Sequence, residues 1–391
     1  MTPNPFVKQY LMTAGPTPVP PAVSQAMAAP MLYHRAPNFV ELYERVLGKL
    51  PKVFQTANDV LVFAASGSGA MESAAANLVR PGKPVLAAAA GKFGERWLEL
   101  AEAYGEQIVR YEPGWGERLD PAELDRLLSE NDGIEVAFAT LSETSTGIVH
   151  DVRAIAEVTK AHDVILAVDA VSGLGAAELR QDDWGIDVVV AGSQKALMCP
   201  PGLAFASVSE RALEYAAGKT GGRYYFDWGK GAKAQAKGNS AFTPAVGLFL
   251  GLDIALDMIR EEGLEDVLAR HALLARATRA GAAAIGLEIY GDADERSTVV
   301  TAVELPDSID GAKLPGALRK LGITANGGQE QLKGRILRIA HCGYFGAFDI
   351  LTSLSGLEMA LSQLGLEVEH GAGVGAAQRV FVEAGVVAAA R

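Results

Sequence analysis

The chain has 391 residues, 49% of them hydrophobic and 21% charged, and its formal net charge at pH 7 is −12. This composition is that of a folded globular protein long enough for two domains. The negative charge argues against a nucleic-acid or anionic-membrane partner, because either would need a basic face. Two cysteines, Cys199 and Cys342, are too few for a disulfide framework and indicate a reducing compartment. No signal peptide or membrane-spanning segment is evident, so we expect a cytoplasmic protein.

The first part of the chain predicts an extended arm followed by a large α/β domain. Residues 1–20 are rich in proline, which fixes φ and removes hydrogen-bond donors, so they predict an arm. Residues 21–262 alternate short apolar runs with helical patterns, which predicts a doubly wound, mostly parallel, seven-stranded sheet. The expected strands are 60–64, 83–88, 107–110, 136–140, 164–169, 188–191 and 203–208, and the helices include 71–79, 96–104, 121–129, 152–161 and 243–262. Pro244 is expected in the first turn of the last helix.

The second part, residues 263–391, predicts a smaller α+β domain. Strands are expected at 287–290, 299–303 and 335–339, and helices at 264–281, 313–321 and 347–364. The Ala- and Val-rich tail, 371–391, predicts one more helix.

A lone lysine and a carboxylate follow two neighbouring strands of the expected sheet. Lys195 comes just after strand 188–191, at the edge where open α/β sheets bind their ligands. A lysine held there can attack a carbonyl, although most loop lysines are simply solvated. Asp169 closes strand 164–169, where it is either a helix cap or an acid that keeps a pyridinium nitrogen protonated. Both side chains could face one ligand.

Two further segments offer polar groups at strand ends. Residues 65–70, Ala-Ser-Gly-Ser-Gly-Ala, stand between a strand and a helix, so their backbone N–H groups and the helix dipole favour an anion such as a phosphate. They match neither the dinucleotide-binding glycine pattern nor a P-loop, which disfavours a nucleotide enzyme. Residues 142–147, Ser-Glu-Thr-Ser-Thr-Gly, could hold a phenolic or carboxylate oxygen, or form an ordinary loop.

As a set, these segments resemble the class V, fold-type I aminotransferases, which use pyridoxal 5′-phosphate (PLP). The resemblance extends from Gly15 to Ile339 and is nearest to the alanine–glyoxylate, serine–pyruvate and aspartate–glyoxylate branch. Its motifs are Ser-Gly-Ser-Gly at 66–69, Glu-Thr-Ser-Thr-Gly at 143–147, Val-Asp-Ala-Val-Ser at 168–172, Gly-Ser-Gln-Lys-Ala at 192–196 and Pro-Pro-Gly at 200–202.

The resemblance implies a role for each matching residue in cofactor binding. Lys195 would form the Schiff base with PLP and later move a proton, and Asp169 would pair with the pyridine nitrogen. Val171 would pack on one face of the ring, and Phe93 falls where this branch often has a stacking aromatic residue. The phosphate would be contacted by Ser68, Gly69, Ala70 and Gln194, and Thr144 would lie near the 3′-oxygen of the ring.

Substrate binding and assembly are implied in the same way. Arg338 would grip the substrate α-carboxylate with a bidentate fork, and the pocket would be lined by Gly15, Pro16 and Thr17. Arg35 would meet a second carboxylate, or else lie on the surface or at an interface. Thr243 would serve the phosphate of the neighbouring subunit, which implies a homodimer with shared sites. Ser240 departs from the tyrosine that relatives often carry there, and this puts one cross-subunit phosphate contact in question.

The remaining candidates are histidines and a thiol. No two histidines have metal-ligand spacing, so we expect no metal site. His341 is either a pocket residue or a satisfied structural histidine, and Cys342 is expected to be structural. We therefore predict transfer of an amino group from alanine, serine or aspartate to a small 2-oxo acid, with glyoxylate, or else pyruvate, as acceptor. The alternatives are a 2-aminoethylphosphonate transaminase, a cysteine or selenocysteine lyase, and a non-catalytic subunit that kept the fold.

Overall fold

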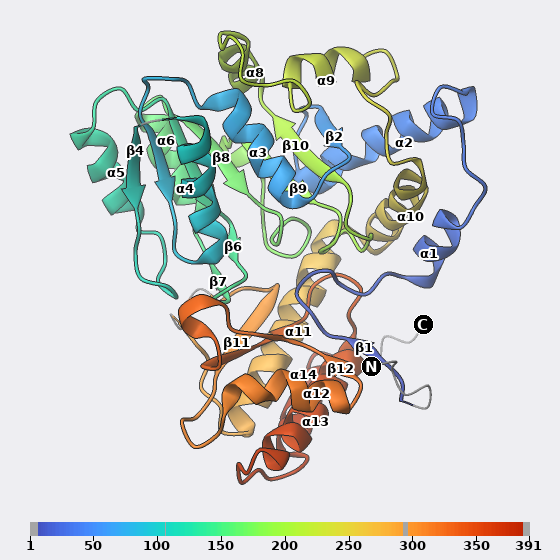
Figure 1. The fold of residues 1–391 in the computed structure, drawn as a ribbon. Coiled ribbons are helices and arrows are strands. Elements are labelled where there is room, and N and C mark those ends of the chain that lie inside the picture. Colours follow the sequence, from blue (N-terminus) through green and yellow to red (C-terminus); the bar gives the residue numbers. More distant parts are fainter. Residues whose placement is uncertain (1–6, 106, 292–295, 386–391) are drawn as a thin grey trace.

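The computed structural model describes residues 7–105, 107–291 and 296–385. Its central feature is a seven-stranded sheet in the order β2-β10-β9-β8-β5-β3-β4, drawn in the upper half of Figure 1. Only β10 runs antiparallel to its neighbours within the described sheet. The strands are β2 (Val60–Phe63), β3 (Val85–Ala88), β4 (Ile108–Tyr111), β5 (Val136–Thr140), β8 (Ile165–Asp169), β9 (Val188–Gly192) and β10 (Ala204–Val208). The predicted mostly parallel, seven-stranded α/β sheet is confirmed.

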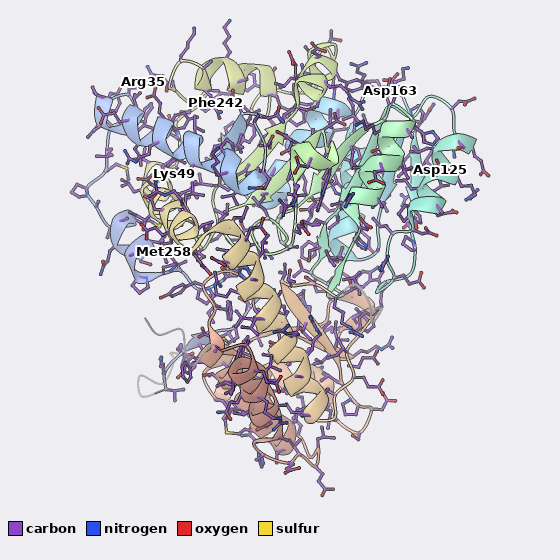
Figure 2. The ribbon with its side chains drawn as sticks, turned by 180° about the vertical axis from the view of Figure 1, so that it is seen from behind. Arg35, Lys49, Asp125, Asp163, Phe242 and Met258 are labelled. Atoms are coloured by element: carbon purple, nitrogen blue, oxygen red, sulfur yellow. The ribbon has the colours of Figure 1, made fainter. Side chains whose placement is uncertain are left out.

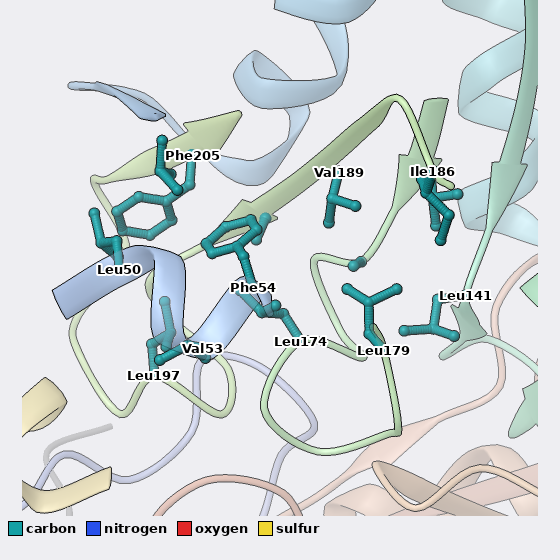
Figure 3. Close-up of a cluster of buried hydrophobic side chains, with 14 of the residues drawn as sticks. Leu50, Val53, Phe54, Leu141, Leu174, Leu179, Ile186, Val189, Leu197 and Phe205 are labelled. Carbon is teal, nitrogen blue, oxygen red and sulfur yellow. The ribbon is translucent and has the colours of Figure 1, made fainter. Parts of the chain in front are cut away.

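Helices cover both faces of the sheet, and this explains why its strands are continuous apolar runs. One core packs the sheet against α2 (Pro37–Phe54), α5 (Pro121–Glu130), α6 (Val152–Ala161) and α10 (Val246–Glu262). Figure 3 shows a part of it, where Leu50 and Phe54 of α2 lie with Phe205 of β10. The opposite core lies under α3 (Gly67–Leu78), α4 (Lys92–Tyr104), α8 (Glu210–Ala217) and α9 (Trp228–Gln235). Neighbouring strand residues alternate between these cores, as Leu86 and Val85 do.

A smaller unit follows the sheet in the chain and has its own core. It holds an antiparallel sheet of β11 (Val300–Glu304), β14 (Ile336–Ala340) and β13 (Asn326–Gly327). Its helices are α11 (Leu264–Ala284), α12 (Leu314–Lys320), α13 (Ala347–Gln363) and α14 (Ala372–Glu383). In Figure 1, α11 runs from the upper body down into this unit.

The N-terminal arm crosses between the two parts. Its β1 (Tyr10–Leu11) pairs in parallel with β12 (Ile323–Thr324) of the smaller unit. The arm then passes the carboxyl edge of the large sheet and enters α1 (Pro21–Met27). The other short elements are β6 (Ser142–Glu143), β7 (Ile148–Val149) and α7 (Gln181–Trp184).

Several local predictions need correction. Helix α10 begins at Val246, because the N–H of Val246 bonds back to Pro244 in a turn, so Pro244 precedes the helix. Residues 287–290 form no strand; they make a single bridge, Ile289 to Val303, at the sheet edge. Helices α3 and α4 begin four residues earlier than predicted, so the Gly-Ser segment and Phe93 belong to first helical turns. The tail is helical as α14, and residues 386–391 lie outside the described part.

Within the described residues, no helix combines the length and the apolar character needed to cross a membrane.

Candidate active site

The carboxyl ends of five strands meet at one edge of the sheet. The strands β2, β3, β5, β8 and β9 all point the same way, because the antiparallel β10 stands between β2 and β9. After them come the starts of α3 and α4, the loop 142–147, Asp169 and Lys195. Topology alone therefore gathers the segments that the sequence singled out.

Lys195 is buried at this edge, with 8% of its surface exposed. Its Nζ donates a hydrogen bond to the carbonyl oxygen of Ala14 in the arm and lies 5.9 Å from the centre of the Phe93 ring. A Cβ on Gly15 would stand 2.4 Å from Nζ, so only glycine fits against the lysine at that position. Burial lowers the pKa of Lys195, so more of the amine is neutral and nucleophilic than in water.

Asp169 ends β8, the neighbour of the strand that leads to Lys195. The side chain is 4% exposed, and its Oδ1 accepts a hydrogen bond from the N–H of Val171 at 2.7 Å. Burial is the main cause that raises the pKa of Asp169 to about 6, and the charge of Glu143 adds to it. The charges of Arg96 and Lys195 act in the opposite direction. A cation placed beside Asp169 would thus be strongly favoured.

The first turn of α3 packs closely against the two strand ends. A Cβ on Gly67 would lie 2.8 Å from the side chain of Val171, and one on Gly192 would lie 3.4 Å from Cα of Gly67. The approach of Val171 requires glycine at position 67. The N–H groups of Gly69 and Ala70 already donate to Ser66 O, which leaves those of Gly67 and Ser68 for a ligand at this helix start. Beside this turn, Oε1 of Gln194 is buried without a hydrogen-bond partner among the described residues.

The loop 142–147 is buried and joins the large sheet to the smaller unit. The hydroxyl of Thr144 bonds to that of Ser172, and the carbonyl oxygen of Thr144 accepts a hydrogen bond from Nη1 of Arg338. Arg338, on β14, is 6% exposed, and its Nε donates to Gly327 O at 3.0 Å. Burial lowers the pKa of Arg338 to about 10, while the charge of Glu143 raises it. The remaining N–H groups of this buried guanidinium can serve a carboxylate.

The arm closes the site from one side. Thr17 donates its backbone N–H to Gln194 O at 3.0 Å and its hydroxyl to Lys195 O at 2.9 Å. The N–H of Ala14 donates to Oδ1 of Asn326, which lies opposite Arg338 in the β13–β14 pair. Gly15 and Thr17 therefore stand beside Lys195, with Pro16 between them in the chain.

Sequence reasoning missed three participants: Ala14, Asn326 and Glu143. Ala14 acts through backbone atoms, and Asn326 is 312 residues away from it, so neither leaves a local pattern. Glu143 did leave a signal, since it is the one acid in a run of hydroxyl residues.

Arg35 and Thr243 are not brought to Lys195 within one chain. Arg35 is exposed on the loop before α2, and Figure 2 places it, like Phe242, at the end of the molecule away from the smaller unit. Thr243 is exposed as well and lines a cavity of about 30 Å³ with Phe63 and Tyr225. Ser240 lines the same cavity, and its hydroxyl donates to Phe242 O.

His341 and Cys342 have structural environments. Nδ1 of His341 bonds to Thr298 O at 2.8 Å and Nε2 to the hydroxyl of Thr301 at 2.9 Å, which uses both ring nitrogens. Burial lowers the pKa of His341 to about 3, so the ring is neutral. Cys342 is completely buried directly after β14, and burial raises its thiol pKa to about 11. It lacks the exposure and the low pKa of a sulfur-transferring cysteine.

The residues that the resemblance assigns to PLP fit that group. A phosphate needs backbone donors at a helix start, and the first turn of α3 offers the N–H groups of Gly67 and Ser68. The amide of Gln194, with its unpartnered buried Oε1, stands beside this start. A cationic ring nitrogen needs an acid such as Asp169, and an aldehyde needs an amine whose pKa is lowered, as that of Lys195 is.

Comparisons with known proteins agree with this geometry. Residues 9–339 match the family model described as "Aminotransferase class-V". A relative from Synechococcus sp. (strain PCC 6716), named "Soluble hydrogenase, small subunit", is 41% identical and covers 96% of this chain and 98% of its own. The serine–glyoxylate aminotransferase of Methylorubrum extorquens is 36% identical over 96% of both chains. The structure of pyridoxamine–pyruvate aminotransferase from Mesorhizobium loti superposes with a TM-score of 0.93, at 30% identity, over 98% of this chain and 100% of its own.

Proposed function

Because the chain belongs to the class V aminotransferases, we propose that it transfers an amino group from a small L-amino acid to glyoxylate. It is a PLP-dependent aminotransferase. The observation that carries the proposal is the buried Lys195, held at the sheet edge among Asp169, Phe93 and Arg338. Bound PLP supplies an electron sink that stabilises negative charge on the carbon from which a proton leaves.

The residues of this chain hold the cofactor and handle the proton. The start of α3 and Gln194 would hold its phosphate, and Phe93 and Val171 would pack against its ring. Asp169 keeps the ring nitrogen protonated, because a buried carboxylate gains most from a cation beside it. Nζ of Lys195 takes and returns the proton, and burial, which lowers the pKa of this amine, favours the neutral form that can act as a base.

Arg338 selects substrates that carry an α-carboxylate. Its Nε and Nη1 already donate to Gly327 O and Thr144 O, which fixes the plane of the guanidinium. The N–H groups left over can form two parallel bonds to a carboxylate. Both an amino acid and a 2-oxo acid have this group, so one arginine serves both halves of the ping-pong reaction.

We infer the size of the donor from the residues around Lys195, and the acceptor from the names of similar proteins. Gly15 and Thr17 of the arm stand beside Lys195, so we expect a donor with a small side chain such as that of alanine, serine or aspartate. Glyoxylate is the acceptor named for the Methylorubrum relative, and pyruvate is the one named for the Mesorhizobium structure. We place glyoxylate first.

We further propose that the protein is a cytoplasmic homodimer with shared sites. Both cysteines are free and buried, which suits a reducing compartment. Large side chains are exposed on the loop before α2 and before α9: Met31 by 76%, Tyr33 by 63% and Tyr224 by 72%. Such aromatic surfaces are typical of subunit interfaces. Arg35 and Thr243 lie in the neighbouring segments and would reach the partner's site.

A spectroscopic screen tests the proposal. The purified protein with PLP should show a visible absorption band that a good amino donor bleaches and glyoxylate restores. L-alanine, L-serine and L-aspartate are the first donors to assay, and glyoxylate and pyruvate the first acceptors. A lasting band that none of the common L-amino acids bleaches would favour the second candidate, a non-catalytic PLP-binding subunit. That candidate has support in the name of the Synechococcus relative.

Dilution tests the assembly. If Thr243 serves the partner's cofactor, dilution to monomers should release PLP, as measured by gel filtration with absorbance detection. A monomer that retains PLP fully would contradict shared sites.

A further inference from the structure

Glu143 is a completely buried carboxylate where the chain leaves β5. Its Oε2 accepts hydrogen bonds from the N–H groups of Phe93 at 3.0 Å and Gly94 at 2.9 Å. Its Oε1 accepts from the N–H of Ser145 at 3.0 Å and from the Ser145 hydroxyl at 2.6 Å. A Cβ on Gly91 would lie 2.5 Å from Cγ of Glu143, so the side chain is enclosed on that side as well.

Three of the four partners can only donate. Backbone N–H groups never accept, and the Ser145 hydroxyl can give its proton to the same oxygen. A protonated carboxyl or an amide would turn a hydrogen toward one of these donors. Burial raises the pKa of Glu143 above its ordinary value, although the bonds from Ser145, Gly94 and Phe93 oppose this rise. The donors around the carboxylate, not its burial, favour the charged form. The arrangement is therefore built for the ionised carboxylate.

The hydrogen bonds of Glu143 connect two segments that have separate roles in the proposed function. Phe93, in the first turn of α4, is the ring that faces Lys195. Thr144, next in the chain, bonds to Ser172 and to Arg338. The negative charge of Glu143 also acts directly on Arg338 and on Asp169, since it raises the pKa of each.

We propose that Glu143 is a positioning residue that sets the Phe93 ring, the Thr144 carbonyl and Arg338 in register for cofactor and substrate. This inference rests on the proposed function. Glu143 touches neither ligand itself, because its four bonds already occupy both oxygens. Glu143 acts on the Phe93 ring through the start of α4, and on Arg338 through the loop 142–147.

A second buried carboxylate provides the matched control. Glu358 on α13 is 2% exposed, and its oxygens accept from the N–H groups of Gly371 and Gly373, each at 2.8 Å. It thus holds the start of α14 as Glu143 holds the start of α4, but its partners belong to the smaller unit and none of them contacts Lys195 or Arg338. If both glutamates serve only to hold the start of a helix, replacing either one should have the same effects.

The experiment compares Glu143→Gln with Glu358→Gln in the full-length protein. The apoprotein is titrated with PLP to obtain its dissociation constant, and KM and kcat are measured for the fastest of the three donors. The urea midpoint of each apoprotein measures folding. We expect both variants to lower the urea midpoint. Glu143→Gln should raise the PLP dissociation constant and the donor KM at least about tenfold, whereas Glu358→Gln should leave both within about twofold.

Two further variants keep the test informative if Glu143→Gln does not fold. Glu143→Asp retains the charge and should recover part of the PLP affinity. Ser145→Ala removes one of the four bonds and should weaken PLP binding by a few-fold. If the Glu143 variants match wild type in PLP affinity and donor KM, or change only in urea midpoint as Glu358→Gln does, the inference is wrong. A wild-type protein that binds PLP but transaminates nothing would refute the proposed function instead, and the PLP affinities would still test Glu143.

Discussion

Two sets of buried polar residues differ in how completely they are hydrogen-bonded. On the smaller-unit side, His341 has a partner for each ring nitrogen, and Glu358 has one for each oxygen. On the sheet-edge side, Nζ of Lys195 bonds to one carbonyl oxygen, and Gln194 leaves a buried oxygen unpartnered among the described residues. Because unpaired buried polar groups cost stability, a fold retains them where they act on a ligand. Lys195 and Gln194 follow this expectation. Pairing alone does not identify a site, since Nδ1 of His271 and the hydroxyl of Ser353 are also buried without a partner among the described residues.

The largest expected effect comes from Lys195→Ala. Loss of the amine removes both the cofactor attachment and the proton carrier, so we expect turnover to fall at least about 10⁴-fold. The free energy of unfolding should stay level or rise, because a poorly paired buried amine is removed. Steady-state kinetics and urea melts measure the two effects.

Lys219→Ala is the matched control for that variant. Lys219 is also 8% exposed and donates Nζ to a single carbonyl oxygen, that of Ala76, at the far end of α3. It should keep its turnover, and its free energy of unfolding should change in the same direction as that of Lys195→Ala, because the two amines are equally buried and similarly paired. Unchanged turnover in Lys195→Ala would overturn the assignment of the site.

Arg338→Lys should have the next largest effect. The lysine keeps the positive charge but loses the planar fork and the two bonds that orient it, to Gly327 O and Thr144 O. We expect kcat/KM for the amino donor to fall about 100-fold, or about 3 kcal/mol, mainly through KM. PLP affinity should change little. A loss of PLP affinity with an unaltered donor KM would place Arg338 at the cofactor rather than at the substrate.

The sheet and its polar edge could be predicted from the sequence because their signals are local. Each strand is a continuous apolar run between turn residues, and in parallel strands the next polar residue falls at the shared edge, as Asp169 and Lys195 do. The strand predictions failed where the pairing is short. Residues 287–290 were predicted as a strand but make only one bridge, and the two-residue strands β1 and β12 were not predicted. Helix α2 was not identified, although its apolar residues Phe39, Leu42, Tyr43, Val46 and Leu50 recur at helical spacing and Pro51 lies only in its last turn.

The remaining parts of the site depend on contacts that no local pattern encodes. Ala14 acts through its carbonyl oxygen, and Asn326 reaches it from more than 300 residues away. Arg35 and Thr243 match the family motif but lie away from Lys195 in their own chain, so any role there needs a second subunit. The sequence identified candidate site residues, but only the folded arrangement of the chain shows which of them lie near Lys195.

Asp169→Asn should change stability in a pH-dependent way. Burial raises the pKa of Asp169 from 3.8 to about 6, so the folded apoprotein holds this proton more tightly than the unfolded chain. The extra stability that this bound proton gives the folded protein is fully present below about pH 4 and is lost as the pH rises through 6. The neutral asparagine should therefore stabilise the apoprotein by about 1–3 kcal/mol at pH 8 and by almost nothing at pH 4. Urea melts at both pH values measure this. The exposed Asp163→Asn (Figure 2) should show no such rise, and a gain for Asp169→Asn that is equal at both pH values would contradict the cause.

The smallest expected effect concerns His341, whose ring nitrogens are both hydrogen-bonded. Thr301→Val keeps the shape of a side chain that is 2% exposed on β11 but removes the hydroxyl bonded to Nε2 of His341. The ring nitrogen would be left buried without a partner, so we expect a loss of about 1 kcal/mol in the free energy of unfolding. Since burial keeps His341 neutral, the loss should be flat between pH 6 and pH 8. The kcat/KM should stay within about twofold of wild type, because His341 makes both of its ring bonds to threonines of the smaller unit. A larger fall in kcat/KM, with stability unchanged, would mean that His341 serves the active site rather than the structure of the smaller unit.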